Sequence, residues 1–114
     1  MSTPSPKLKR TYTRGDQRPA LKVRFVERDA HRRTPANLTG VTSVMFTLAT
    51  KTDKAICSGA CTILDAPAGL VVYQWRATDL DVTPGEYRGW FTISYDGELE
   101  TKSDLIIEVR KRPS

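Results

Sequence analysis

The side chains that could do chemistry are few in this sequence and lie far apart along the chain. His31 is the only histidine, and no nucleophile or second histidine lies beside it. Asp79 and Asp81 could bind calcium, but that ion needs about six or more oxygen ligands, and no glycine-bearing loop of further carboxylates follows. No glycine-rich phosphate loop follows a predicted strand. We therefore expect Asp79 and Asp81 to be turn residues. We expect no catalytic, cofactor or metal site, and a protein that is not an enzyme.

The two cysteines are four positions apart. Cys57 and Cys61 match neither the Cys-x-x-Cys of redox sites nor half of a zinc site, because no second pair exists. In a regular strand they would lie about 13 Å apart, at about 3.3 Å per residue, which is beyond the reach of a disulfide. We expect free thiols. The alternatives are a local disulfide through a tight turn at Ser58-Gly59 and a contact with another chain.

Basic residues gather at the two ends of the chain. The net charge is +5: residues 1–19 carry five basic residues and one acidic one, residues 110–114 carry three basic residues, and the remainder is left with −2. Such ends are typical of arms that dock on an acidic partner or on nucleic acid; solvated tails that only aid solubility are the alternative. The candidate interface residues of the arms are Lys7, Lys9, Arg10, Arg14, Arg110, Lys111 and Arg112.

Trp90 is a further candidate interface residue. It falls on the strand face opposite Tyr87, Phe91 and Ile93, where a half-exposed sheet should carry polar groups. Either the N-terminal arm covers it, or it anchors an interface, since tryptophan and arginine dominate interface hot spots. Arg88 on the same face favours contact.

These candidates are positioned by strands, which the alternation of apolar and polar residues predicts. The clearest is the stretch 83–97, in which Asp96-Gly97 predicts a two-residue turn back into residues 98–101. A polar loop, with Pro35 breaking any pairing, is expected over residues 29–37. Further strands are predicted over residues 7–14 (an added edge strand), 20–26, 41–48, 55–64 with an interruption at Ser58-Gly59, 70–75 and 105–110.

About seven strands without a helical period predict an all-β fold, an antiparallel Ig-like β-sandwich with extended basic termini. One domain is expected over residues 15–110, between an extended arm (1–14) and a basic tail (111–114). Tyr87 is similar to the corner tyrosine of such sandwiches, whose hydroxyl bonds to an upstream backbone group. The predicted core comprises Leu21, Val23, Phe25, Val44, Phe46, Val71, Tyr73, Trp75, Tyr87, Phe91, Ile93, Ile107 and Val109.

Four stretches resemble, in order and spacing, the N-terminal domain of the phage baseplate upper protein family. They are residues 15–21, 37–46, 65–75 and 84–91, the last reading Pro-Gly-Glu-Tyr-Arg-Gly-Trp-Phe. The resemblance implies an Ig-like sandwich in a phage particle, where the domain fastens an appendage to its neighbours. Members of this family continue into a long receptor-binding region, whereas this chain stops at Ser114, so attachment rather than adhesion is implied.

The function expected is therefore that of a non-enzymatic structural protein of the tail, baseplate or neck of a virion. Its partners are other virion structural proteins, with several copies in the particle and neither a membrane nor a small-molecule substrate. With no secretory signal at the N-terminus, we expect synthesis in the host cytoplasm. The alternatives are a capsid decoration protein and, ranked lower, a basic nucleic-acid-binding sandwich, because no sheet face interleaves the aromatic and basic residues that single-strand binders use.

Overall fold

The structure is a computed structural model that describes residues 8–28, 33–35 and 37–113, and all regular structure within these residues is β-strand. The expected all-β fold class is thereby confirmed. The strands of this part of the chain are β1 (Leu8–Thr13), β2 (Leu21–Arg24), β3 (Val26–Arg28), β4 (Arg33–Pro35), β5 (Ser43–Ala49), β6 (Ala55–Ala60), β7 (Thr62–Asp65), β8 (Leu70–Tyr73), β9 (Gly85–Tyr95) and β10 (Glu98–Arg110).

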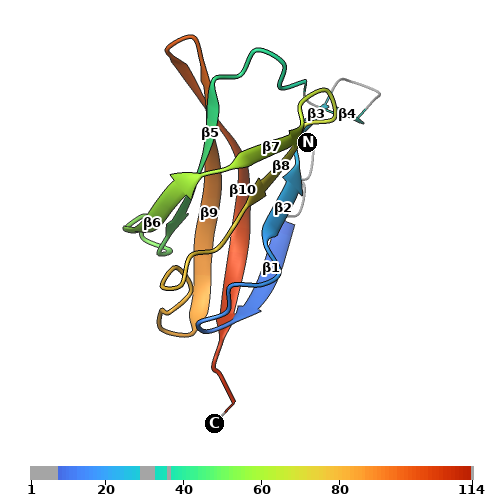
Figure 1. Ribbon diagram of the computed structural model, residues 1–114. Helices are drawn as coiled ribbons and strands as arrows, with labels where there is room; N and C mark the ends of the chain where they lie inside the picture. The colour runs from blue at the N-terminus through green and yellow to red at the C-terminus, as the bar shows by residue number, and fades with distance from the viewer. Residues whose placement is uncertain (1–7, 29–32, 36, 114) are drawn as a thin grey trace, which may run out of the picture.

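Two sheets face each other and form a sandwich (Figure 1). The large sheet has the strand order β1-β10-β9-β5-β6 and the small sheet the order β2-β8-β7, while β3 and β4 form a separate ribbon. Aromatic rings join the layers: the ring centroids of Phe25 and Phe91 lie 5.1 Å apart, and those of Phe46 and Tyr73 lie 4.9 Å apart. The predicted sandwich is therefore confirmed.

The hairpin of β9 and β10 forms the middle of the large sheet. Asp96 has a φ of 42° and Gly97 a φ of 87°, as the predicted two-residue turn requires. β10 then runs without interruption through the region predicted as a separate last strand, with a register shift between Lys102 and Leu105. β5 pairs with the other side of β9, so β9 has a partner on both sides.

The predicted core is buried with one exception. Twelve of its thirteen residues are buried, and Tyr87 is half-buried against them. The Tyr87 hydroxyl donates a hydrogen bond to the carbonyl of Thr83, which holds the ring near the surface and confirms the corner-tyrosine prediction. The core also contains apolar residues that the prediction left out: Tyr12, Leu38, Leu48, Ala49, Leu80 and Leu105.

The chain crosses from the large sheet to the small sheet at Cys61, between β6 and β7. The predicted interruption at Ser58-Gly59 is wrong, since both residues pair with β5 inside β6. Gly59 lies under the ring of Tyr73, and a Cβ at this position would lie 2.9 Å from Cε1 of that ring. The glycine thus marks a close approach inside a strand rather than a break.

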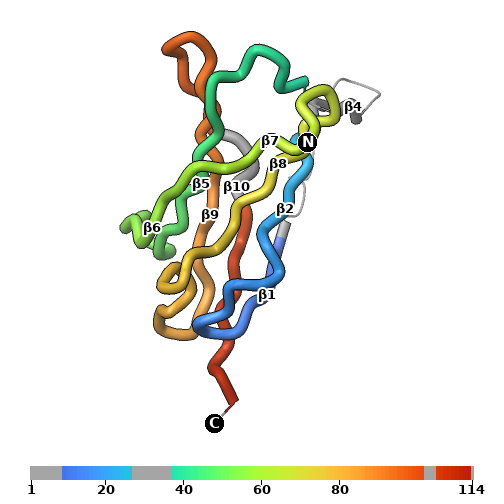
Figure 2. Tube along the Cα trace, in the orientation of Figure 1, coloured from blue at the N-terminus to red at the C-terminus, as the bar shows by residue number. Residues whose placement is uncertain are grey.

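The first described strand corrects the predicted domain boundary. β1 pairs in parallel with β10, and Figure 2 shows the blue strand beside the red one. Tyr12 of β1 is buried in the core. The sandwich therefore begins at Leu8 rather than at residue 15, which agrees with the prediction of an added edge strand over residues 7–14. Because β1 is parallel to β10, the large sheet is mixed rather than purely antiparallel.

Pro35 was expected to break any pairing, and this expectation is wrong. It lies in β4 and pairs with Val26 of β3. A proline is tolerated in such a two-stranded ribbon because a residue that faces the open edge has no ladder hydrogen bond to donate.

Candidate interaction surfaces

The described basic residues of β1 lie against the chain itself. Nζ of Lys9 lies 2.9 Å from a carboxylate oxygen of Glu108 and 3.6 Å from one of Glu86. The hydrogen bond to Glu108 raises the pKa of Lys9. Arg10 donates a 3.4 Å hydrogen bond to the carbonyl of Lys9. Lys7, the remaining candidate of this segment, lies outside the described residues.

Two arginines bind the segment that follows β1 to distant parts of the chain. Nε of Arg14 lies 3.1 Å from Oδ1 of Asp81. Arg112, in the C-terminal tail, lies 3.1 Å from Asp16 and donates a 3.0 Å hydrogen bond to the carbonyl of Arg14. The tail is thus held beside the turn that follows β1.

The other two basic candidates near the C-terminus differ. Nε of Arg110 lies 2.8 Å from Glu108, whereas Lys111 is exposed and forms no ion pair with the residues that the structure describes. Three acidic residues of the body, Asp81, Glu86 and Glu108, thus pair with the chain's own basic ends. Exposed ion pairs of this kind contribute little to stability, so a partner could exchange them at small cost.

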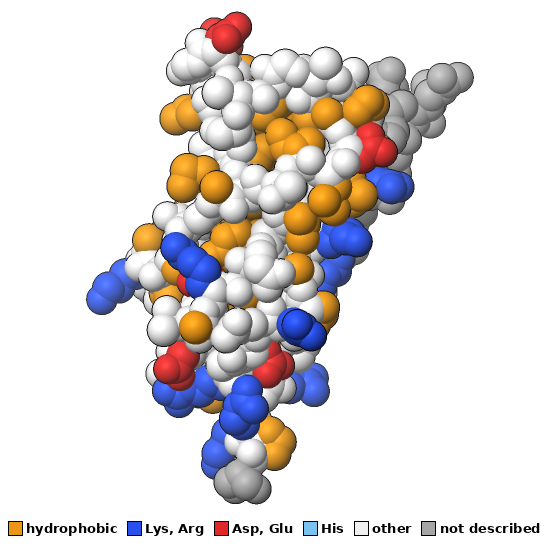
Figure 3. All heavy atoms as spheres, viewed as in Figure 1, with side chains coloured by type: hydrophobic (Ala, Val, Ile, Leu, Met, Phe, Trp, Pro, Cys, Tyr) orange, Lys and Arg blue, Asp and Glu red, His pale blue; other side chains and the backbone are white. Residues whose placement is uncertain are grey.

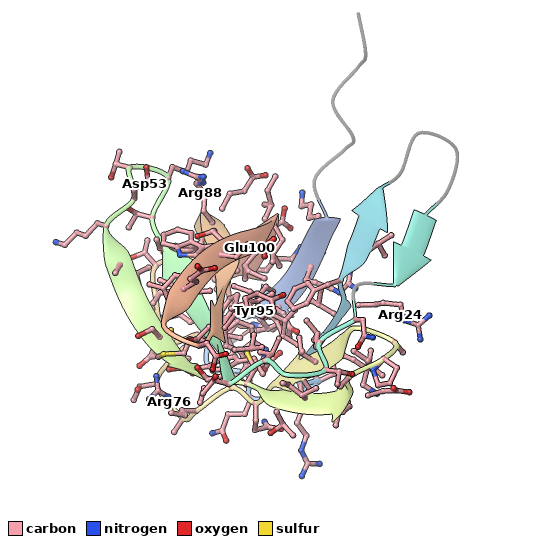
Figure 4. All side chains as sticks on the ribbon, turned by 90° about the horizontal axis from the view of Figure 1, so that it is seen from above. Arg24, Asp53, Arg76, Arg88, Tyr95 and Glu100 are labelled. Atoms are coloured by element: carbon pink, nitrogen blue, oxygen red, sulfur yellow. The ribbon has the colours of Figure 1, made fainter. Side chains whose placement is uncertain are left out.

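Arg88 and Trp90 lie on the outer face of the large sheet, as the alternation predicted. Arg88 donates a hydrogen bond to Asp53, and Figure 4 shows these two side chains together at the edge of the molecule. Cζ of Arg88 lies 6.0 Å from the centre of the Trp90 ring, at the outer limit of a cation–π contact. Trp90 is half-buried. Coverage of its ring by the N-terminal arm stays a prediction, because residues 1–7 of that arm lie outside the described residues.

Apolar side chains extend the surface around Trp90. Met45 pairs with Thr92, the next outward-facing residue of β9, and Ile106 pairs with Arg88. Paired residues point to the same face of a sheet. Met45 is 42% exposed, and Ile106 is half-exposed. Apolar side chains are unusual here, because an open antiparallel sheet usually carries polar side chains on its solvent-facing side. We call Met45, Arg88, Trp90 and Ile106 the outer-face patch.

A buried carboxylate lies in the loop between β8 and β9. Asp79 is 4% exposed and is the one buried charged residue among the described side chains. Its Oδ2 accepts a 2.5 Å hydrogen bond from the Tyr73 hydroxyl and a 2.9 Å bond from the backbone N–H of Arg76. Burial alone would raise the pKa of Asp79, but these bonds and the charge of Arg76 lower it.

Arg76 connects this carboxylate to the large sheet. Its Nε lies 3.3 Å from Oδ1 of Asp79, and its Nη2 donates a 2.7 Å hydrogen bond to the carbonyl of Ser58 in β6. The prediction of Asp79 as a turn residue is confirmed by the 3.2 Å bond from its N–H to the carbonyl of Arg76. The burial of Asp79 was not predicted, because a spacing of six residues in an irregular loop does not indicate a contact with Tyr73.

Both thiols are free, as predicted. Cys57 ends up in β6 and Cys61 at the crossing that follows it, and both are half-buried against the core. Burial, and after it the nearby carboxylate of Asp79, raises the pKa of Cys57 to about 11. Burial raises the pKa of Cys61 to about 12. These thiols therefore pack as small apolar groups.

Neither a metal cluster nor a membrane helix is found in the part of the chain that the structure describes. No three His, Cys, Asp or Glu side chains of this part lie close enough together to share a metal ion. No helix there is long and apolar enough to cross a membrane. His31 lies outside the described residues.

Comparisons with known proteins identify a fold but no family. No family model and no curated protein matches the chain. Among solved structures, the crystal structure of CopC from Methylosinus trichosporium OB3b is similar, with a TM-score of 0.53 and 14% identity over 96% of this chain and 91% of that one. At this identity the likeness shows a shared β fold alone.

Proposed function

We propose that this protein is a non-enzymatic structural component of a phage particle, in its tail, baseplate or neck, that fastens neighbouring subunits to one another. The proposal rests on the four stretches that resemble the baseplate upper protein family. The Ig-like sandwich that this resemblance implied agrees with the observed fold. The alternative is a capsid decoration protein, which would likewise attach to neighbouring virion subunits without catalysing a reaction.

The outer-face patch is the structural observation that supports an attachment role. Trp90 supplies a large, rigid contact area, and Arg88 beside it is held by Asp53, so little side-chain freedom is lost when a partner binds. Met45 and Ile106 widen the patch on either side of β9. A neighbouring virion subunit with an apolar surface fits these properties, since contiguous exposed apolar groups mark protein contacts.

The basic ends supply a second, weaker contact. Their described ion pairs are exposed. Arg10, within β1, and Lys111, just after β10, add further positive charge. An acidic neighbour could therefore replace the pairs with Glu108 or Asp81. A deletion that tests the arm must end at residue 7, because one that ends at residue 10 removes half of β1.

Two substitutions that leave the net charge unchanged test the proposal. Particles are assembled with the wild-type chain, with Trp90→Ala or with the matched control Thr92→Ala on the same strand and face, and the incorporated copies are counted by quantitative mass spectrometry. We expect Trp90→Ala to lower incorporation at least about tenfold, as loss of a hot-spot residue does, and Thr92→Ala to leave it unchanged. Equal incorporation of all three folded proteins contradicts the proposal.

A further inference from the structure

β6 is an edge strand of the large sheet. It lies last in the strand order, at the left of the molecule in Figure 1, and no described strand pairs with its outer side. Its sequence, Ala-Ile-Cys-Ser-Gly-Ala, contains neither a charged residue nor a proline. Edge strands are usually protected by just such residues, because an open row of N–H and C=O groups can pair with another chain.

The register identifies which backbone groups face outward. The N–H of Cys61 donates a 2.8 Å bond to the carbonyl of Val44 in β5. In an antiparallel ladder, residues that bond to the partner strand alternate with residues whose N–H and C=O point away from it. Ala60 and Ser58 therefore turn these groups to the open edge. The bond from Arg76 to the Ser58 carbonyl on this side agrees with that direction.

Arg76 is held in place at this edge. The buried carboxylate of Asp79 binds its Nε, while the Arg76 side chain remains 58% exposed. Figure 4 shows Arg76 at the periphery of the molecule, beside β6. An arginine in this position can bind one carboxylate within the protein and a second from outside, since its guanidinium has five donors. The edge thus combines the outward N–H of Ser58 and the outward N–H and C=O of Ala60 with an arginine that is fixed at the Ser58 carbonyl.

The charges around β6 favour an acidic partner. Lys54 precedes the strand and is exposed, and Asp53 next to it is engaged by Arg88. Figure 3 shows Lys and Arg side chains on this side of the molecule. A second copy of the chain is a poor partner, because antiparallel pairing of two β6 strands about Ser58 would bring two Arg76 side chains together.

We propose that the open edge of β6 binds an extended segment of another protein that carries a carboxylate opposite Ser58. The segment adds a strand to the large sheet, with backbone hydrogen bonds to the N–H of Ser58 and to both backbone groups of Ala60. Arg76 keeps its bond to the Ser58 carbonyl, and the segment's carboxylate binds the exposed side of the same guanidinium. This site is separate from the outer-face patch, and it does not depend on a place in a phage particle.

The test uses a synthetic probe, the capped peptide acetyl-Thr-Val-Thr-Glu-Thr-Val-Thr-amide, and a matched peptide with Lys in place of Glu. Each is titrated into the ¹⁵N-labelled full chain and followed by NMR. We expect chemical-shift changes confined to residues 54–61 and 76, slower hydrogen exchange at Ser58 and Ala60, and binding of the Glu peptide about tenfold tighter than that of the Lys peptide, because charge-assisted hydrogen bonds are the stronger ones.

Two variants make the result specific. Arg76→Glu should reverse the preference between the peptides. Ser58→Pro, which removes an outward N–H and remains compatible with an edge strand, should abolish binding of both. The proposal is overturned if neither peptide changes the spectrum at about 1 mM, if both bind the wild type equally, if the changes lie away from β6, or if Arg76→Glu keeps the original preference. The effect of Trp90→Ala on incorporation into particles does not depend on any of these peptide-binding results.

Discussion

The Tyr73 hydroxyl, at the end of β8, donates a 2.5 Å hydrogen bond to the carboxylate of Asp79, six residues later. The same carboxylate oxygen accepts the N–H of Arg76, so one buried group closes the loop between β8 and β9. Through Arg76 this loop also reaches the carbonyl of Ser58 in the large sheet. The two sheets are therefore joined by polar contacts at this side as well as by the aromatic core.

Tyr73→Phe should destabilise the protein by about 1–3 kcal/mol, because it leaves a buried carboxylate with one donor fewer. The free energy of unfolding is measured by urea denaturation. Tyr95→Phe, at a half-buried ring of β9, is the control and should change stability by less than about 0.5 kcal/mol. If Tyr73→Phe is as stable as this control, the bond does not contribute as inferred.

Acid should unfold the protein partly through Asp79. Its pKa is lower in the folded state than the ordinary value of 3.8, so its ionisation stabilises the fold above about pH 4, and this contribution is lost as the pH falls through the folded-state pKa. Asp79→Asn keeps a hydrogen-bond acceptor but does not titrate. We expect the urea midpoint of the wild type to fall more steeply than that of the variant as the pH falls below about 4; parallel curves would refute this.

The two tryptophans should differ sharply in their effect on stability. Trp75 is 1% exposed, and its ring contacts those of Tyr12, Phe46 and Tyr73. Trp75→Ala should cost about 3–5 kcal/mol, as other large-to-small changes in cores do. Trp90→Ala, on the outer face, should cost about 1 kcal/mol. Similar thermal and urea midpoints for the two variants would contradict the assignment of one to the core and the other to a contact surface.

The thiols of the folded protein should react slowly with a disulfide reagent at pH 8. Burial raises the pKa of Cys57 to about 11 and that of Cys61 to about 12, so few thiolates form, and the thiolate is the nucleophile. In denaturant both should react at the rate of a free cysteine. Absorbance of the released thiol against time measures both rates, and a native rate equal to the denatured one would show that the thiols are accessible.

Local patterns were sufficient to predict much of the fold. Asp96-Gly97 specified its hairpin because two adjacent residues that tolerate positive φ suit few other turns. Alternation placed Phe46, Phe91 and Trp75 in the core because a buried face requires a period of two. The outward position of Trp90 followed from the same alternation.

Long-range contacts could not be predicted in this way. The parallel pairing of β1 with β10 joins residues about a hundred positions apart, and no local signal distinguishes it from an unpaired arm. The interactions of Asp79 depend on where a loop passes Tyr73, and the glycine of β6 was mistaken for a break because its role depends on a ring from the opposite sheet. The sequence predicted that the two ends of the chain are basic. It did not predict that their side chains would form ion pairs with Asp16, Asp81 and Glu108 of the same chain.

Attachment within a phage particle is tested most directly by the protein content of purified particles. Particles assembled with the native chain are separated on a density gradient and analysed by quantitative mass spectrometry, before and after a wash in about 1 M salt, which screens exposed ion pairs. We expect the chain in several copies per particle and retained after the wash, because the outer-face patch is largely apolar. Its absence from particles, or its complete loss in the wash, would contradict the proposed function.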